Sequence, residues 1–240
     1  AGWAEAEYRA FGIPFPRAGE RLELLDEATA AVRALLHDGV ASVEGKHVTL
    51  LDARCEPRPL QSQLPVWIGG AGERRTAAVA ARHADGWNVP FVSPEVLARK
   101  RAVLGEHCVA AGRAPGEVSL GVNVIVCDDD ASLAAQFGPR SEAVRPGSVV
   151  GSSVAQVTDA LARYVAAGAD TVNVALRAPW NPTALDRAGA AVAALCFFKA
   201  PPTTESCLAA ISGDTMSIIT PVPCSNPATL VSRGSRCTCQ

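Results

Sequence analysis

The sequence predicts an α/β fold, a partial (β/α)₈ TIM barrel followed by an irregular C-terminal tail. Short apolar runs alternate four times with segments of helical periodicity, which is the pattern of βα units and a parallel sheet. Apolar residues make up 48% of the 240 residues and charged residues 19%, which allows a sizeable core. From residue 200 onward prolines recur and the alternation stops.

Before the first predicted strand the chain contains one helix and one extended segment. Leucine and valine recur at helical spacing from Glu20 to Leu36, and Gly39 follows as a stop signal. The segment from His47 to Leu51 is predicted to be extended. Prolines between residues 57 and 65 then indicate a loop, because proline cannot continue a helix.

Four βα units follow. Apolar or β-branched runs bounded by turn residues predict strands at 65–69, 86–91, 118–126 and 171–176. Helices are predicted after them at 73–83, 94–111, 131–137, 153–168 and 182–196. Two helices have strong start signals. Ser93, Pro94 and Glu95 supply an N-cap, a first-turn proline and an early acid, and Ser153 to Gln156 forms a capping box.

Four strands are half of the number that a closed (β/α)₈ barrel requires. Half a barrel leaves two parallel edges whose backbone groups need partners. Two arrangements would supply these partners: another half-barrel N-terminal to this sequence, or two copies of the chain that complete one another. In a third arrangement the sheet stays open. The chain begins with Ala1 and its only methionine is Met216, so we expect that a natural start was removed or never included.

The predicted domain, residues 1–199, is followed by a tail, residues 200–240, of different composition. No helical or strand period continues beyond the run Ser217–Thr220, and we expect this tail to be poorly ordered. Five of the eight cysteines lie in the last 45 residues, and such crowding is consistent with a disulfide-bonded appendage, a metal site or incidental thiols. Because their spacings repeat no ligand pattern, we interpret them as incidental and expect no metal; they are Cys196, Cys207, Cys224, Cys237 and Cys239.

Charge and hydropathy narrow the function classes. The formal net charge is −2, so the chain lacks the basic footprint of a nucleic-acid-binding protein. No apolar run approaches the roughly 20 residues of a membrane-spanning helix, and no signal peptide opens the chain. We therefore expect no nucleic acid and no membrane among its partners, and a cytoplasmic location.

The most informative stretch is the run VWIGGAGERR at residues 66–75. A strand ends in Gly69, Gly70, Ala71 and Gly72, and a helix follows. Glycine lets the backbone turn sharply and approach a ligand, and the first N–H groups of a helix favour an anion such as phosphate. Such a turn lies at the carboxyl ends of the strands, where barrel active sites are built.

A tight strand–helix connection with no ligand explains the same glycines, so this alternative stays open. The motif is neither a dinucleotide-binding fingerprint nor a P-loop. Arg74 and Arg75 are candidates for added positive charge.

Other polar residues give weaker signals. The four histidines are scattered, so a metal role is disfavoured; they are His37, His47, His83 and His107. The acidic run Asp128–Asp130 after a strand is interpreted as solvated rather than cation-binding. No serine has the context of a nucleophile elbow.

Several segments, in order along about residues 1–195, resemble luciferase-like monooxygenases. They include FGIPFP at 11–16, PVWIGG at 65–70, AARHADGWN at 80–88 and AGAD at 167–170. Because the likeness runs through the whole series, it is more specific than any one motif. The chain is most similar to members that use coenzyme F420, a deazaflavin, and relatives use FMN.

The resemblance implies that this chain is the C-terminal half of the barrel. It also implies that Gly69, Gly70, Ala71 and Gly72 bind the cofactor phosphate, and that Trp87 and Asn88 face the cofactor pocket. For Trp87 the alternative is an aromatic of the barrel core. Asn88 needs a polar partner, because it closes an apolar strand.

The resulting hypothesis is an F420-dependent oxidoreductase, or alternatively an FMN-dependent one, acting on a small-molecule substrate, with a homodimer as a candidate assembly. In the family the first four strands supply much of the ring pocket and usually the proton-handling residues, and this chain lacks them, so no catalytic residue is predicted. A non-catalytic half-barrel that binds a phosphate-bearing ligand or nothing is the alternative. Another phosphate-binding barrel enzyme would need a catalytic acid at a strand end, which the first and third strands do not offer.

Overall fold

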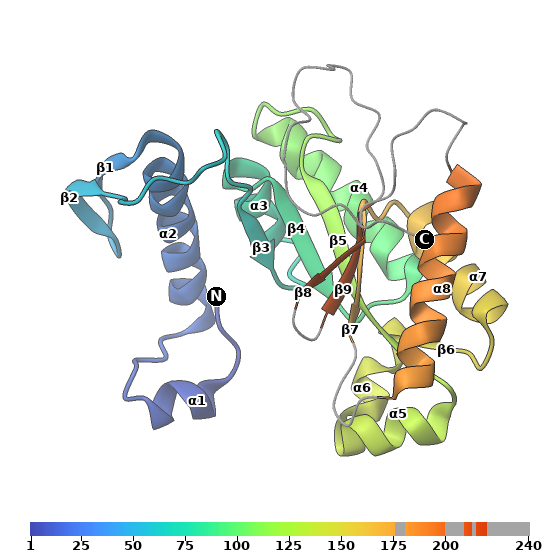
Figure 1. Ribbon diagram of the computed structural model, residues 1–240. Coiled ribbons are helices and arrows are strands. Elements are labelled where there is room, and N and C mark those ends of the chain that lie inside the picture. Colours follow the sequence, from blue (N-terminus) through green and yellow to red (C-terminus); the bar gives the residue numbers. More distant parts are fainter. Residues whose placement is uncertain (176–180, 200–208, 213–214, 220–240) are drawn as a thin grey trace.

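A computed structural model of the chain describes residues 1–175, 181–199, 209–212 and 215–219 (Figure 1). It contains a two-stranded hairpin and a larger sheet. The helices are α1 Glu5–Ala10, α2 Ala18–Asp38, α3 Thr76–His83, α4 Pro94–Ala110, α5 Asp130–Phe137, η1 Gly138–Arg140, α6 Ser141–Val144, η2 Arg145–Gly147, α7 Val154–Ala166 and α8 Pro182–Lys199. The strands are β1 Val40–Glu44, β2 Thr49–Arg54, β3 Trp67–Gly69, β4 Gly86–Pro90, β5 Ser119–Cys127, β6 Ser148–Val150, β7 Thr171–Ala175, β8 Ala209–Ser212 and β9 Thr215–Ile219.

The larger sheet confirms the four predicted parallel strands. Its order is β3-β4-β5-β7-β9-β8, and β6 pairs with the end of β5. Strands β3, β4, β5 and β7 are parallel to their neighbours in that order. The register places Gly69 beside Asn88, Asn88 beside Gly121, and Asn123 beside Asn173.

The two faces of this sheet have different environments, because successive side chains of a strand alternate. On one face the strand side chains join a single core with α3, α4, α7 and α8; those of Ile68, Trp87, Leu120, Val122, Val172 and Val174 are almost completely buried. The opposite face, called here the inner face, carries Trp67, Gly69, Asn88, Gly121, Asn123 and Asn173. One face of the sheet therefore contributes to the hydrophobic core, and the inner face carries the polar side chains.

The first part of the chain, from α1 to β2, lies to one side of the sheet, next to α3 (Figure 1). Asp26 of α2 accepts from Arg82 of α3 at 2.8 Å. The expected extended segment is confirmed as part of β2, but its antiparallel partner β1 was not predicted. The Glu27 carboxylate of α2 holds the turn of this hairpin, because it accepts from the backbone N–H groups of residues 46–48.

Two segments of the tail that was expected to be poorly ordered are strands, and the second includes part of the run Ser217–Thr220. β8 and β9 are antiparallel, and β9 pairs antiparallel with β7 along its whole length. The expectation that residues 200–240 are poorly ordered stays a prediction, and residues 200–208, 213–214 and 220–240 lie outside the described ones. The pairing of β9 with β7 has a physical reason. Without it β7 would present an edge of unpaired backbone groups, and the β-branched sequence of β9 favours a strand that pairs with them.

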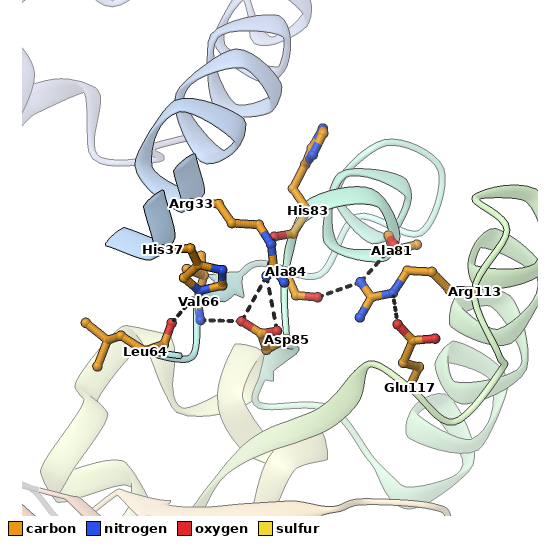
Figure 2. A network of polar contacts seen from close by, with 10 residues as sticks. All are labelled: Arg33, His37, Leu64, Val66, Ala81, His83, Ala84, Asp85, Arg113 and Glu117. Carbon is orange, nitrogen blue, oxygen red and sulfur yellow. Dashed lines mark hydrogen bonds and ion pairs between the residues drawn. The ribbon is translucent and has the colours of Figure 1, made fainter. Parts of the chain in front are cut away.

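An aspartate before β4 holds the amino-terminal ends of three strands together, and Figure 2 shows its contacts with Val66 and Arg33. The backbone N–H of Asp85 donates to Val66 O at 2.8 Å, and its carboxylate accepts from Val66 N at 2.8 Å. Its carbonyl accepts from Ser119 N at 2.9 Å. Arg33 of α2 donates to the carboxylate at 3.1 Å and to His83 O at 3.2 Å. One residue thereby connects α2 with β3, β4 and β5.

The same arrangement recurs before β7. The backbone N–H of Asp170 donates to Leu120 O at 2.8 Å, and its carboxylate accepts from Leu120 N at 2.7 Å. Arg101 of α4 donates to that carboxylate at 2.6 Å and to Val118 O at 3.3 Å. Each Ala-Asp pair, Ala84-Asp85 and Ala169-Asp170, thus ties a new strand to its neighbour.

We expect Asp85→Asn to lower the free energy of unfolding by about 1–3 kcal/mol, because the charged acceptor for Arg33 and Val66 N is lost in a partly buried place. Urea denaturation measures this. The control is Glu5→Gln, which removes an ion pair with Arg9 whose partners are 51% and 77% exposed and should change stability by less than about 0.5 kcal/mol. Equal stability of the two variants would contradict the role assigned to Asp85.

Candidate functional site

The predicted glycine turn lies at the carboxyl end of β3 and leads into α3. Gly69, Ala71 and Gly72 are exposed, and Gly70 has φ +138°, a conformation that favours glycine. A Cβ on Gly72 would lie 2.8 Å from Thr76 Oγ1, too close for a side chain. A Cβ on Gly69 would meet nothing within 4 Å. The turn is therefore a bare stretch of backbone beside open space.

The backbone amides of this turn are only partly used inside the protein. Gly70 N donates to Asn88 O at 3.0 Å, and Ala77 N donates to Gly72 O at 3.0 Å. For the N–H groups of residues 71–75, the described part of the chain supplies no hydrogen-bond acceptor. Helix α3 starts at Thr76, later than predicted, so residues 73–75 form a turn that extends this set of free donors. Such a set is suited to an anion.

Two buried side chains donate hydrogen bonds to carbonyl groups of the turn. The Trp87 indole N–H donates to Gly70 O at 2.7 Å. Lys100 of α4, 4% exposed, donates through Nζ to Ala71 O at 2.6 Å, and its ammonium lies 5.7 Å from the centre of the Trp87 ring. With the carbonyls fixed inward, the amides of the turn are left facing outward.

Glu73 neutralises the Lys100 charge. Its Oε1 accepts from Lys100 at 2.9 Å and from Arg99 at 3.0 Å, and these hydrogen bonds lower the pKa of the Glu73 carboxyl. His107 Nε2–H donates to Glu73 O at 2.9 Å. The acid is thus held in an ion-pair network by α4, while Arg74 is exposed beside the turn.

Asn88 lies on the inner face, next to Gly69 in the sheet. Its Nδ2 donates to Asn123 Oδ1 at 3.0 Å, and its Oδ1 accepts from Asn173 Nδ2 at 3.1 Å. Asn173 Nδ2 also donates to Asn123 Oδ1 at 3.1 Å. The polar partner expected for Asn88 is therefore a cluster of carboxamides from three strands.

The structure places the residues predicted for the cofactor site in two environments. Gly69, Gly70, Ala71, Gly72 and Asn88 lie together at the carboxyl end of β3 and on the inner face beside it. The Trp87 side chain, 0% exposed, lies in the core on the opposite face, which was the alternative interpretation. Its contact with the turn is the hydrogen bond to Gly70 O. Cofactor binding by these residues stays a prediction.

Sequence reasoning missed Lys100, Asn123, Asn173 and the inner position of Trp67. One signal was available for Asn173, because the spacing Asp-x-x-Asn occurs at residues 85–88 and again at 170–173. A lysine in the middle of a helix gives no such signal, because its burial depends on the turn that packs over it.

The remaining candidates are accounted for by contacts within the protein. His83 and His47 face Asp26 and Glu23, respectively. Asp128 pairs with Arg187, Asp129 caps α5, and Asp130 pairs with Arg145. Within the described ranges no group of His, Cys, Asp and Glu could hold a metal, and none of the described helices is long and apolar enough to cross a membrane.

The family model of luciferase-like monooxygenases matches residues 1–143, which is more than half of the chain and includes β3, the glycine turn, β4 and β5. The chain belongs to the luciferase-like monooxygenase family.

Two curated relatives match parts of the chain. An uncharacterized protein of Mycobacterium tuberculosis is 35% identical over 86 residues, which are 36% of this chain and 29% of that protein. The pyrimidine monooxygenase RutA of Caulobacter segnis is 32% identical over 110 residues, which are 42% of this chain and 30% of that protein. The matched segments thus span less than a third of either relative.

The fold also occurs in solved structures of other proteins. EDTA monooxygenase from Chelativorans sp. BNC1 matches with a TM-score of 0.65 and 16% identity, over 83% of this chain and 65% of that one. The coenzyme F420-dependent tetrahydromethanopterin reductase from Methanopyrus kandleri matches with a TM-score of 0.59 and 18% identity, over 79% of this chain and 69% of that one. The α/β fold with its parallel sheet therefore corresponds to part of the length of these barrel structures.

The lowered pKa of Glu73 predicts a pH-dependent contribution to stability. Because the folded-state pKa lies below the unfolded value of about 4.3, the contribution is fully present above that value and is lost as pH falls through the folded pKa. Urea denaturation of wild type and Glu73→Gln at several pH values tests this. The stability difference should be largest near neutral pH and should shrink below about pH 4; a difference independent of pH would contradict it.

Proposed function

We propose that this chain is part of an F420-dependent oxidoreductase of the luciferase-like monooxygenase family, with FMN as the alternative cofactor and a small molecule as substrate. The observation that carries the proposal is the exposed glycine turn, whose free amides face outward at the carboxyl end of a parallel strand. Family membership supports the oxidoreductase class. The fold of an F420-dependent structural neighbour agrees with the choice of deazaflavin.

The residues of the turn fit the phosphate of such a cofactor. Side chains are absent at Gly69, Gly70 and Gly72, so a phosphate can approach the backbone N–H groups closely. The partial positive charge of these amides and of the start of α3 favours an anion. Glu73, the nearest acid in the sequence, is paired with Lys100 and Arg99, which reduces its repulsion of a bound phosphate.

Each residue has a distinct part in this proposal. The amides of the turn would hold the phosphate, and Arg74 would add positive charge at its edge. Trp87 and Lys100 position the turn through Gly70 O and Ala71 O. Asn88 would present its carboxamide on the inner face beside Gly69. When bound, the deazaflavin or flavin ring supplies hydride chemistry, and the protein supplies binding and orientation.

We expect Gly70→Asp to weaken the binding of both F420 and FMN. A carboxylate about 4 Å from the phosphate, at an effective dielectric near 20, would repel it by roughly 4 kcal/mol per charge pair, or up to about a thousandfold in affinity. Titration of each cofactor, followed by fluorescence, measures the affinity, and the tighter of the two identifies the cofactor. Raising the salt concentration should reduce the effect of the substitution.

The matched control is Gly70→Asn, which has the same shape and the same strain at φ +138° but no charge. Thermal melting checks that both variants are folded. Equal affinities of folded Asp and Asn variants would place the phosphate elsewhere. Failure of the wild-type chain to bind either cofactor would favour a half-barrel without this activity.

A further inference from the structure

The series of four parallel strands has two edges, and only one of them is covered. Among the described strands β3, at one end of the sheet, pairs with β4 only. At the other end of the series β7 pairs with β5 on one side and with β9 on the other (Figure 1). The β3 edge is therefore bare, and the β7 edge is covered by β9 with β8 behind it, called here the C-terminal strand pair.

The bare edge of β3 presents backbone groups for pairing. Successive residues of a strand direct their N–H and C=O groups to opposite neighbours. Val66 O accepts from Asp85 N at 2.8 Å, on the β4 side. The next residue, Trp67, and the second after it, Gly69, therefore direct their backbone groups to the bare edge. Such an edge favours pairing with another strand.

The covered edge of β7 has the same alternation. Asp170 N donates to Leu120 O at 2.8 Å, on the β5 side, so the next residue and every second residue after it face β9. At the centre of this five-residue pairing Asn173 lies opposite Ser217. The sequences of β8 and β9, AAIS and TMSII, contain neither charge nor proline. The residues that usually protect a natural edge from pairing are thus absent from this strand pair.

Strand number and direction identify a partner for both edges. Two copies of the chain together have the eight parallel strands that a closed (β/α)₈ barrel requires. Helices α3, α4, α7 and α8 pack on the face opposite the inner face, as in the outer ring of such a barrel. In a twofold pair β7 of each copy would lie beside β3 of the other, with all strands parallel. The inner faces would then be enclosed, together with Trp67, which is 41% exposed in the single chain.

We propose that the edges of β3 and β7 are the interface for a second copy of this chain, and that the C-terminal strand pair blocks this interface by occupying β7. A closed pair has two junctions, and each contains one β7 edge, so covering β7 prevents both. A tethered strand competes at an effective concentration of about millimolar, which exceeds a micromolar concentration of second copies. The strand pair is in this sense an autoinhibitory contact. The inference concerns assembly and does not depend on which cofactor binds.

The test is Ser217→Pro in the full chain. Proline at the centre of β9 removes a backbone N–H and interrupts the pairing with β7. By sedimentation velocity at about 10–100 μM, we expect the wild type to be a monomer and Ser217→Pro to be a dimer, because the tethered competitor is weakened. The dissociation constant of the dimer should fall by at least about tenfold.

Two further variants show which edges the dimer uses. Ser217→Thr keeps the N–H and adds a β-branched side chain, so it is the matched control and should stay monomeric. Gly69→Pro, added to Ser217→Pro, removes an N–H that is directed to the bare β3 edge, and a Cβ at residue 69 would meet nothing within 4 Å. This double variant should return to the monomer.

A peptide with the sequence of residues 209–219 supplies the covering strands in trans. Added in excess, it should convert the Ser217→Pro dimer to monomer, whereas the same peptide with proline at the position of Ser217 should not.

The outcomes separate this closed pair from other associations. A dimeric wild type, a folded Ser217→Pro that stays monomeric, or a double variant that remains dimeric would each overturn the proposal. A series of species larger than the dimer would indicate open edge-to-edge association and would overturn it too. Thermal melting checks folding. If Ser217→Pro does not fold, Ser217→Gly, which weakens the strand but keeps its N–H, decides in the same way.

Discussion

The backbone and carboxylate of Asp85 set the register of three parallel strands. Its N–H and carboxylate engage both backbone groups of Val66 before β3, and its carbonyl accepts from Ser119 at the start of β5. A shift of one residue would move every side chain to the other face of the sheet. With this register in place, Trp87 and Val89 enter the core, and Asn88 is directed to the inner face beside Gly69. Asp170 repeats the constraint at β7, which brings Asn173 beside Asn123.

The glycine turn depends on a second constraint, the buried ammonium of Lys100. A buried charge is costly unless it is paired and hydrogen-bonded, and here both conditions are met by Glu73 and by Ala71 O. The backbone N–H groups of residues 71–75 meanwhile have no acceptor among the described residues. The features that stabilise the turn therefore also prepare it for an anion, so its stability and its proposed function are not in conflict.

On the inner face, two glycines make room for a large aromatic side chain. Gly86 and Gly121 have no structural need for positive φ, as neither is among the glycines with that conformation. Their role lies in the space that they leave for the Trp67 indole. Without those two glycines the indole would be displaced from the sheet, and the polar cluster at Asn88 would lose its aromatic neighbour.

The sequence by itself determined the alternation of strands and helices, the parallel strands and the glycine turn, because apolar periodicity and turn chemistry are local properties. It also indicated the family, because several motifs follow one another along the chain in the family's order. Tertiary structure decided what depends on contacts distant in sequence. It buried Trp87, paired Lys100 with Glu73 across 27 positions, and gathered three asparagines from separate strands. It also decided that β9 covers the edge of β7, because an unpaired edge attracts a β-branched segment whatever its place in the chain.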